Sequence, residues 1–181
     1  QSELPVFIVG LPRSGTSLLE RVVGAHSEAH GVGETTLLDD VLMTHLGGGG
    51  PQLAFMVAAA DDAMLERIRA DYLRGLQLQG GRKQRIANKS LMLPRQAGII
   101  GLLFPKATIL ITERDLHDTA ISIWANLFDP IRMAWTSRLD WIGSIAAMHQ
   151  RMMTHWTESL PNPIMTVDYR ELAKNPAQTV P

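Results

Sequence analysis

The stretch VFIVGLPRSGTSLLERVV, residues 6–23, decides how this chain is expected to fold. It continues an apolar run, PVFIVG at residues 5–10, whose β-branched side chains are typical of a buried parallel strand. From Gly15 onward, apolar residues recur at helical spacing to about Ala25. The stretch therefore predicts a strand, a glycine-bounded loop and a helix in direct succession.

The loop of this unit has the spacing of a phosphate-binding loop but lacks the lysine of that motif. Gly10, Gly15 and Ser17 fit the pattern G-x-x-x-x-G-K-[ST], whereas Thr16 stands at the lysine position. An arginine, Arg13, lies inside the loop instead. The pattern therefore favours an anion site, but one built differently from a site for a nucleoside triphosphate.

The loop is rich in groups that bind anions. Its glycines allow a tight turn, the backbone amides of residues 13–17 can face an anion, and the following helix contributes its positive end. Ser14, Thr16 and Ser17 add hydroxyl donors, and Arg13 adds a guanidinium group. Arg13 can either contact the anion itself or only brace the loop.

Further apolar patterns predict that strands and helices alternate along the chain. Strands are expected at residues 84–89, 108–112 and 163–169, and helices at 37–46, 53–78, 94–104, 116–128, 137–160 and 170–175. Residues 26–36 are expected to form a polar loop, and GGGGPQ at 47–52 a flexible break. This alternation predicts an α/β fold of the P-loop-like, three-layer kind, with a central parallel sheet flanked by helices.

Composition limits the classes of protein that remain. The 181 residues are 45% hydrophobic and 19% charged, as in one globular domain, and the net charge of −1 argues against a nucleic-acid partner. No cysteine is present, which excludes cysteine–zinc sites. With no long apolar run and no visible targeting segment, we expect no membrane partner and a cytoplasmic location. A new element begins just before Pro181, so we expect residues 1–181 to be a single domain truncated at its C-terminus.

The residues that follow the predicted strands carry the second functional signal. Ligands of open parallel sheets bind outside the carboxyl ends of the strands. Lys89 ends the second strand expected along the chain, Arg114 follows the third, and Tyr169 ends the fourth. Ser122 lies eight residues after Arg114. Three of the four strand ends thus deliver a cation or the glycine loop to one edge of the sheet.

Together these segments resemble the sulfotransferase family that uses 3′-phosphoadenosine 5′-phosphosulfate (PAPS). The likeness is greatest to the tyrosylprotein sulfotransferases and to bacterial sulfotransferases attached to TPR repeats. Five segments resemble family motifs in the right order: VGLPRSGTSLLERVVGAH (9–26), GVGET (31–35), NKSLMLP (88–94), LFPKATILITERDLHDTAISIW (103–124) and VDYRELAKNP (167–176). The resemblance covers nearly the whole chain.

The resemblance implies in-line transfer of a sulfuryl group from PAPS to an acceptor hydroxyl, without a metal. The acceptor could be a peptide tyrosine, a carbohydrate or a small molecule, and a homodimer is left open. For donor binding, the resemblance implies that the 5′-phosphosulfate is held by Arg13, Ser14, Gly15, Thr16 and Ser17. It implies that Arg114 and Ser122 bind the 3′-phosphate and that Tyr169 contacts the nucleotide. For catalysis, it implies that Glu34 is the general base and that Lys89 and Arg13 stabilise charge.

Several alternatives remain at this stage. His30 rivals Glu34 as the base, because an unperturbed imidazole pKa near 6.5 suits the task. Thr36 stands where the tyrosylprotein enzymes carry an arginine, which weakens the case for a peptide acceptor. One alternative function is a kinase or NTPase with a degenerate loop, for which Asp115 and Asp168 are the strand-end candidates to hold Mg²⁺. Another is a binding domain without catalysis.

Overall fold

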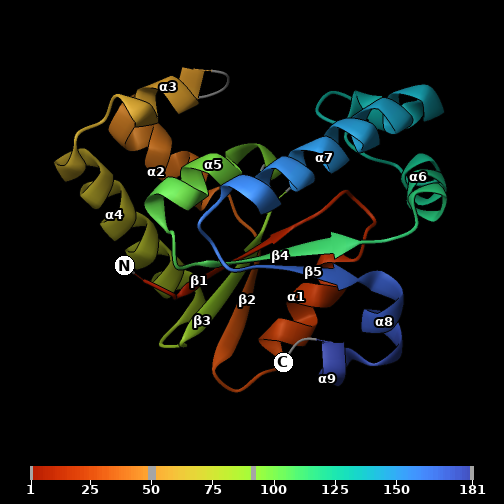
Figure 1. Ribbon diagram of the computed structural model, residues 1–181, viewed down its shortest axis with the longest axis horizontal. Coiled ribbons are helices and arrows are strands. Elements are labelled where there is room, and N and C mark those ends of the chain that lie inside the picture. The colour runs from red at the N-terminus through yellow and green to blue at the C-terminus, as the bar shows by residue number, and fades with distance from the viewer. Residues whose placement is uncertain (1, 49–51, 91–92, 180–181) are drawn as a thin grey trace.

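The computed structural model describes residues 2–48, 52–90 and 93–179 (Figure 1). Its strands form one parallel sheet in the order β2-β3-β1-β4-β5. The strands are β1 (Pro5–Val9), β2 (Ala29–Glu34), β3 (Arg85–Lys89), β4 (Thr108–Glu113) and β5 (Ile164–Asp168). The chain places β2 and β3 on one side of β1 and then crosses to β4 and β5, so the order reverses beside β1. A crevice for ligands is expected at such a switch point.

Helices cover both faces of this sheet (Figure 1). One face carries α1 (Thr16–Gly24), α8 (Tyr169–Lys174) and α9 (Pro176–Thr179). The other carries α2 (Leu37–Leu46), α3 (Leu53–Ala58), α4 (Asp62–Gly80), α5 (Leu93–Leu103) and α7 (Leu139–Ser159). Beyond the carboxyl end of β4 lie α6 (Leu116–Trp124) and a short 3₁₀ helix, η2 (Ala134–Ser137). The predicted three-layer α/β architecture is thereby confirmed.

The central strand β1 supplies both hydrophobic cores, because successive side chains of a strand point to opposite faces. Phe7 and Val9 belong to the core under α2, α4, α5 and α7, whereas Val6 and Ile8 belong to the core under α1 and α8. All five residues of β1 are buried. Burial on both faces explains why β1 reads as a continuous apolar run.

The expectation that residues 26–36 form a loop is wrong, because Ala29–Glu34 make up β2. The segment has two glycines and little β-branched character, so its local pattern does not indicate a strand. It is held instead by pairing with β3, where Ala29 lies opposite Arg85 and His30 opposite Ile86. Tertiary pairing overrides weak strand propensity here.

Three helix predictions are right in kind but wrong in extent. The helix expected at 53–78 is split into α3 and α4, because the side chain of Asp61 caps α4 by accepting the Met64 amide. The helix expected at 116–128 ends at Trp124, and the one expected at 137–160 begins at Leu139. Residues 49–51 of the predicted glycine-rich break lie outside the described residues. No helix of the described part of the chain meets the length and apolarity needed to cross a membrane.

Candidate functional site

The loop between β1 and α1 depends on two glycines that allow close approach. A Cβ at Gly10 would lie 2.1 Å from Thr112 Oγ1 and 2.6 Å from Ser14 Oγ. Gly15 has a φ of +106° and precedes α1, and a Cβ there would lie 2.4 Å from the Tyr169 ring. The two glycines therefore let the loop pack directly on β4 and on the start of α8.

Gly10→Ala should lower the free energy of unfolding by about 1–3 kcal/mol, because its methyl group would overlap two hydroxyl oxygens in a packed site. Gly143→Ala on α7 is a matched control, since nothing lies within 4 Å of the added Cβ. Alanine should stabilise that helix by up to about 1 kcal/mol. Urea unfolding measures both variants, and a Gly10→Ala protein as stable as the wild type would contradict the packing argument.

The N-terminus of α1 is free to receive an anion. Its N-cap is Gly15, no side chain caps it, and no acidic residue lies in its first turn. The first amides of a helix have no partners inside the helix and carry partial positive charge. Thr16 and Ser17 lie in this first turn, so the loop presents amides and hydroxyl groups together.

Ser14 plays a different part from its neighbours in the loop. Its side chain is buried, with the residue only 3% exposed, and its hydroxyl donates to the Leu11 carbonyl at 2.7 Å. The same oxygen lies 2.6 Å from Thr112 Oγ1, and the Ser14 amide also donates to Leu11. In this conformation Ser14 joins the loop to β4, and the accessible hydroxyl groups are those of Thr16 and Ser17.

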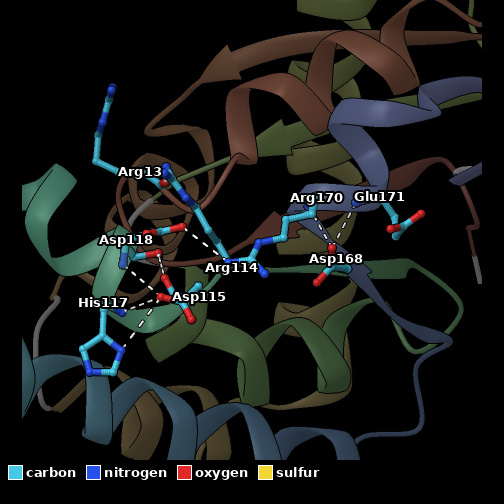
Figure 2. Close-up of polar contacts among 9 residues, drawn as sticks. Arg13, Arg114, Asp115, His117, Asp118, Asp168, Arg170 and Glu171 are labelled. Carbon is cyan, nitrogen blue, oxygen red and sulfur yellow. Dashed lines mark hydrogen bonds and ion pairs between the residues drawn. The ribbon is translucent and has the colours of Figure 1, made fainter.

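Four residues predicted to bind the nucleotide gather beside this loop. Arg13 Nε donates to Ser122 Oγ at 3.1 Å, although 109 residues separate them. Arg114 Nη1 donates to the backbone carbonyl of Arg13 at 3.1 Å (Figure 2). The Arg114 guanidinium also lies over the Tyr169 ring, 4.8 Å from its centroid. Two guanidinium groups, a hydroxyl group and an aromatic ring thus border the open end of α1, and the backbone of Arg13 is part of the bracing.

Asp115, shortly after β4, and Asp168, the last residue of β5, serve as helix caps. Asp115 accepts the amides of His117 and Asp118 at the start of α6, and the Asp118 amide in particular lowers the Asp115 pKa (Figure 2). Asp168 accepts the amides of Arg170 and Glu171 at the start of α8. An ion pair of 3.7 Å between Arg170 and Asp118 connects α8 to α6. Both strand-end carboxylates are therefore engaged with backbone amides.

A second pair of predicted residues meets at the ends of β2 and β3. Glu34 lies opposite Lys89 in the sheet, and Lys89 Nζ donates to Glu34 Oε1 at 3.1 Å. The Lys89 side chain is 11% exposed and that of Glu34 is 65% exposed. A nearly buried cation thus lies beneath a carboxylate that remains open to an incoming molecule.

The neighbour of Lys89 anchors this strand end from below. Asn88 is 1% exposed, and its Nδ2 donates to the hydroxyl of Tyr72 on α4 at 2.7 Å. Burial raises the pKa of the Tyr72 phenol, which keeps it neutral. Phe7 of β1 stacks on the Tyr72 ring at 6.0 Å. The end of β3 is therefore fixed to the core immediately before Lys89.

Other residues considered from the sequence lie elsewhere or serve local structure. His30 is four residues upstream of Glu34 on β2, which is roughly 13 Å along a strand. Thr36 precedes α2 and donates to Asp40 at 2.8 Å. Asn126, four residues after Ser122, donates to the Ser122 carbonyl. Of the two candidate bases, Glu34 lies at the carboxyl end of β2 and His30 near its beginning.

A cavity of about 550 Å³ lies beside Arg114, between α7 and the end of β4. Its walls include Thr112, His149 and Met153. Burial lowers the pKa of His149, so its imidazole is mainly neutral at pH 7. In the described residues, no three histidine, cysteine or acidic side chains are grouped so that they could hold a metal ion.

Two residues that contact the site residues were not predicted from the sequence. Thr112 is a buried partner of Ser14, but within an apolar strand it carries no signal of that role. Glu20 follows the buried Leu19 on α1 and bonds to the backbone near Glu34. A charged residue on the buried face of an otherwise amphipathic helix is the sequence signal that could have indicated Glu20.

These features define an α/β protein of the P-loop-like class, with the loop between β1 and α1 at the switch point of its sheet. The chain belongs to the sulfotransferase family, whose family model matches residues 5–181. The resemblance inferred from the five motifs is confirmed at this level, and the tyrosylprotein subtype stays a prediction.

Comparisons with individual proteins give one sequence relative and several solved structures of similar fold. A protein of Aquifex aeolicus (strain VF5) described as uncharacterized is 27% identical over 190 residues, which span 99% of this chain but 25% of that relative. Among solved structures, a sulfotransferase from Alicyclobacillus acidocaldarius has a TM-score of 0.59 at 16% identity, over 98% of this chain and 77% of its own. The sulfotransferase domain of the Synechococcus PCC 7002 olefin synthase has a TM-score of 0.63 at 18% identity. The match covers 99% of this chain and 71% of that domain's chain. At such identities the structures show a shared fold.

Proposed function

We propose that this domain transfers a sulfuryl group from PAPS to the hydroxyl group of an acceptor. One observation carries the proposal: the cluster of Arg13, Arg114, Ser122 and Tyr169 borders the open N-terminus of α1 at the sheet edge where Glu34 meets Lys89. Donor-binding groups and a candidate base thus come from separate strand ends of one sheet. Membership in the sulfotransferase family supports this pairing of roles.

The donor-binding roles follow from the chemistry of these groups. The amides of the first turn of α1, the hydroxyls of Thr16 and Ser17, and Arg13 suit the 5′-phosphosulfate. Arg114 and Ser122 suit the 3′-phosphate, because guanidinium groups bind phosphate oxygens in a fork geometry. Tyr169, which packs on Gly15, offers an aromatic surface to the nucleotide. No metal is needed, because a sulfuryl group carries less charge than a phosphoryl group and cations of the chain can neutralise it.

The transfer step moves one proton, forms one bond to sulfur and breaks another. Glu34 accepts the proton of the acceptor hydroxyl as its oxygen forms a bond to sulfur. The bond from sulfur to the 5′-phosphate oxygen breaks in line with the new one, leaving 3′-phosphoadenosine 5′-phosphate and a sulfate ester. Lys89 and Arg13 stabilise the negative charge on the oxygens in transit. As in phosphoryl transfer, positioning and electrostatics supply most of the catalysis.

A kinase or NTPase activity is less consistent with this arrangement. The lysine position of the loop is occupied by Thr16. Asp115 and Asp168, the candidates to hold Mg²⁺, each accept two helix amides. In each aspartate both amides are accepted by Oδ1, so the helix cap leaves only Oδ2 for a cation.

Calorimetric titration tests the donor assignment. We expect 3′-phosphoadenosine 5′-phosphate to bind roughly tenfold or more tightly than adenosine 5′-monophosphate, because the 3′-phosphate adds charge-assisted hydrogen bonds. Addition of Mg²⁺ should not strengthen binding, and ATP with Mg²⁺ should bind more weakly. Equal affinity for the two adenosine nucleotides would contradict the 3′-phosphate site, and tight Mg²⁺-dependent binding of ATP would favour a kinase.

A transfer assay decides between an enzyme and a binding domain. With ³⁵S-labelled PAPS, the acceptors to offer are a phenol, a monosaccharide and a tyrosine peptide, which represent the three acceptor classes. Sulfation of one class would identify the substrate chemistry. Nucleotide binding without transfer to any of them would favour a domain that binds but does not catalyse.

A further inference from the structure

Helix α1 carries one acidic side chain on its buried face. Glu20 is 9% exposed and follows Leu19, which is fully buried. Its Oε1 accepts the backbone amide of Gly33 at 2.5 Å. A buried carboxylate is costly unless it is hydrogen-bonded, so this contact gives the side chain a reason to lie where it does.

The backbone that Glu20 holds is an irregular part of β2. Gly31 pairs with Ala87, and the next recorded pair joins Glu34 to Lys89, so three steps along β2 match two along β3. The extra residue is a β-bulge, and Gly33 adopts a φ of +77° within it. Bulges of this kind re-aim side chains and occur near active sites.

The bulge determines which residue lies opposite Lys89. In an unbroken register Gly33 would pair with Lys89, and Glu34 would lie one position further along the strand. A shift of one residue turns a side chain to the other face of the sheet. The salt bridge of 3.1 Å between Glu34 and Lys89 therefore depends on this local backbone shape.

The geometry points to Glu20 as a positioning residue that holds the Gly33 amide in the bulge and so keeps Glu34 beside Lys89. A Cβ at Gly31 would lie 2.7 Å from Glu20 Cγ, so a glycine at this position gives the side chain room to reach its partner. Glu20 lies one turn along the helix whose first turn faces the donor, and it thereby connects the donor loop to the candidate base. The inference rests on the proposed function, in which Glu34 is the base.

Two substitutions separate the hydrogen bond from the volume of the side chain. Glu20→Met removes the acceptor with little change in size, whereas Glu20→Gln keeps an oxygen that can accept from Gly33. Arg21→Met, on the exposed face of the same helix, is the control. In amide hydrogen exchange by NMR, the Gly33 amide should lose protection in Glu20→Met but not in the other two. A Gly33 amide equally protected in Glu20→Met and in the wild type would overturn the inference.

Transfer kinetics test the consequence for catalysis. Glu20→Met should lower the transfer rate on the order of 10²-fold, since small misplacements of a catalytic group have effects of this size. Affinity for 3′-phosphoadenosine 5′-phosphate should not change, and Glu20→Gln should recover most of the lost rate. In a Glu34→Gln background, Glu20→Met should cause no further loss, because the two residues act through one group.

The outcomes distinguish this inference from the proposed function. If Glu34→Gln leaves transfer intact, the proposed base is wrong. If Glu34→Gln abolishes transfer but Glu20→Met does not affect it, the base stands and the positioning role of Glu20 falls. A Glu20→Met effect that persists undiminished in the Glu34→Gln background would also overturn the role, because Glu20 would then act independently of Glu34.

Discussion

Glu34→Gln should lower the rate of sulfuryl transfer by about 10²–10⁴-fold, the usual contribution of a general base. Glutamine has nearly the same shape and keeps an oxygen that can accept from Lys89, which lies 3.1 Å from the carboxylate. The substitution therefore removes proton abstraction with little disturbance of the strand ends. Binding of 3′-phosphoadenosine 5′-phosphate should remain as in the wild type, because the donor cluster is built by other residues.

Single-turnover transfer and calorimetry together measure this effect. Glu28→Gln is a suitable control, because Glu28 is an exposed glutamate shortly before the same strand. Its rate should match that of the wild type. Normal turnover in Glu34→Gln would remove Glu34 as the base, and a parallel loss of nucleotide affinity would mean that Glu34 shapes the donor site instead.

Arg114→Ala should weaken binding of 3′-phosphoadenosine 5′-phosphate by roughly 10–100-fold, the range expected for charge-assisted hydrogen bonds. Arg114 also contacts the Arg13 carbonyl and the Tyr169 ring, so part of any loss could come from a loosened loop. A loosened loop would weaken adenosine 5′-monophosphate as well. The diagnostic quantity is therefore the ratio of the two affinities, which should fall towards one.

Isothermal titration of both nucleotides gives this ratio. Arg138→Ala provides the control, since it removes an exposed arginine that pairs with Asp140 at the start of α7. Arg138→Ala changes the net charge by the same amount as Arg114→Ala, but Arg138 does not belong to the donor cluster. A ratio that stays at its wild-type value in Arg114→Ala would show that Arg114 does not bind the 3′-phosphate.

Most of the fold could be predicted because local patterns are strong where burial is complete. Each residue of β1 is buried, so the strand reads as an unbroken apolar run. The opposite case is β2, which lies at the edge of the sheet and contains Gly31 and Gly33. Its strand conformation comes from pairing with β3 rather than from its own residues, and for that reason the segment was expected to be a loop.

Some features of the candidate site could likewise be predicted from the sequence, whereas others depend on tertiary contacts. That Lys89 and Arg114 come at strand ends follows from the chain itself, because parallel strands deliver their carboxyl ends to one edge. That Arg13 contacts Ser122, 109 residues away, depends on how α6 returns beside the loop. The burial of Ser14 against Thr112 likewise could not be read from a motif that presents Ser14 and Ser17 as equal donors.

By itself, the sequence determined the kind of protein: an α/β fold in the sulfotransferase family, with a loop that has phosphate-loop spacing but no lysine at the motif position. These features are local, since a glycine spacing or an apolar run requires only neighbours along the chain. Only the tertiary structure decided which side chains meet. The pairing of Glu34 with Lys89 needs an extra residue in β2, held by Glu20 from another element. Contacts of this kind depend on packing between distant segments, which no local pattern encodes.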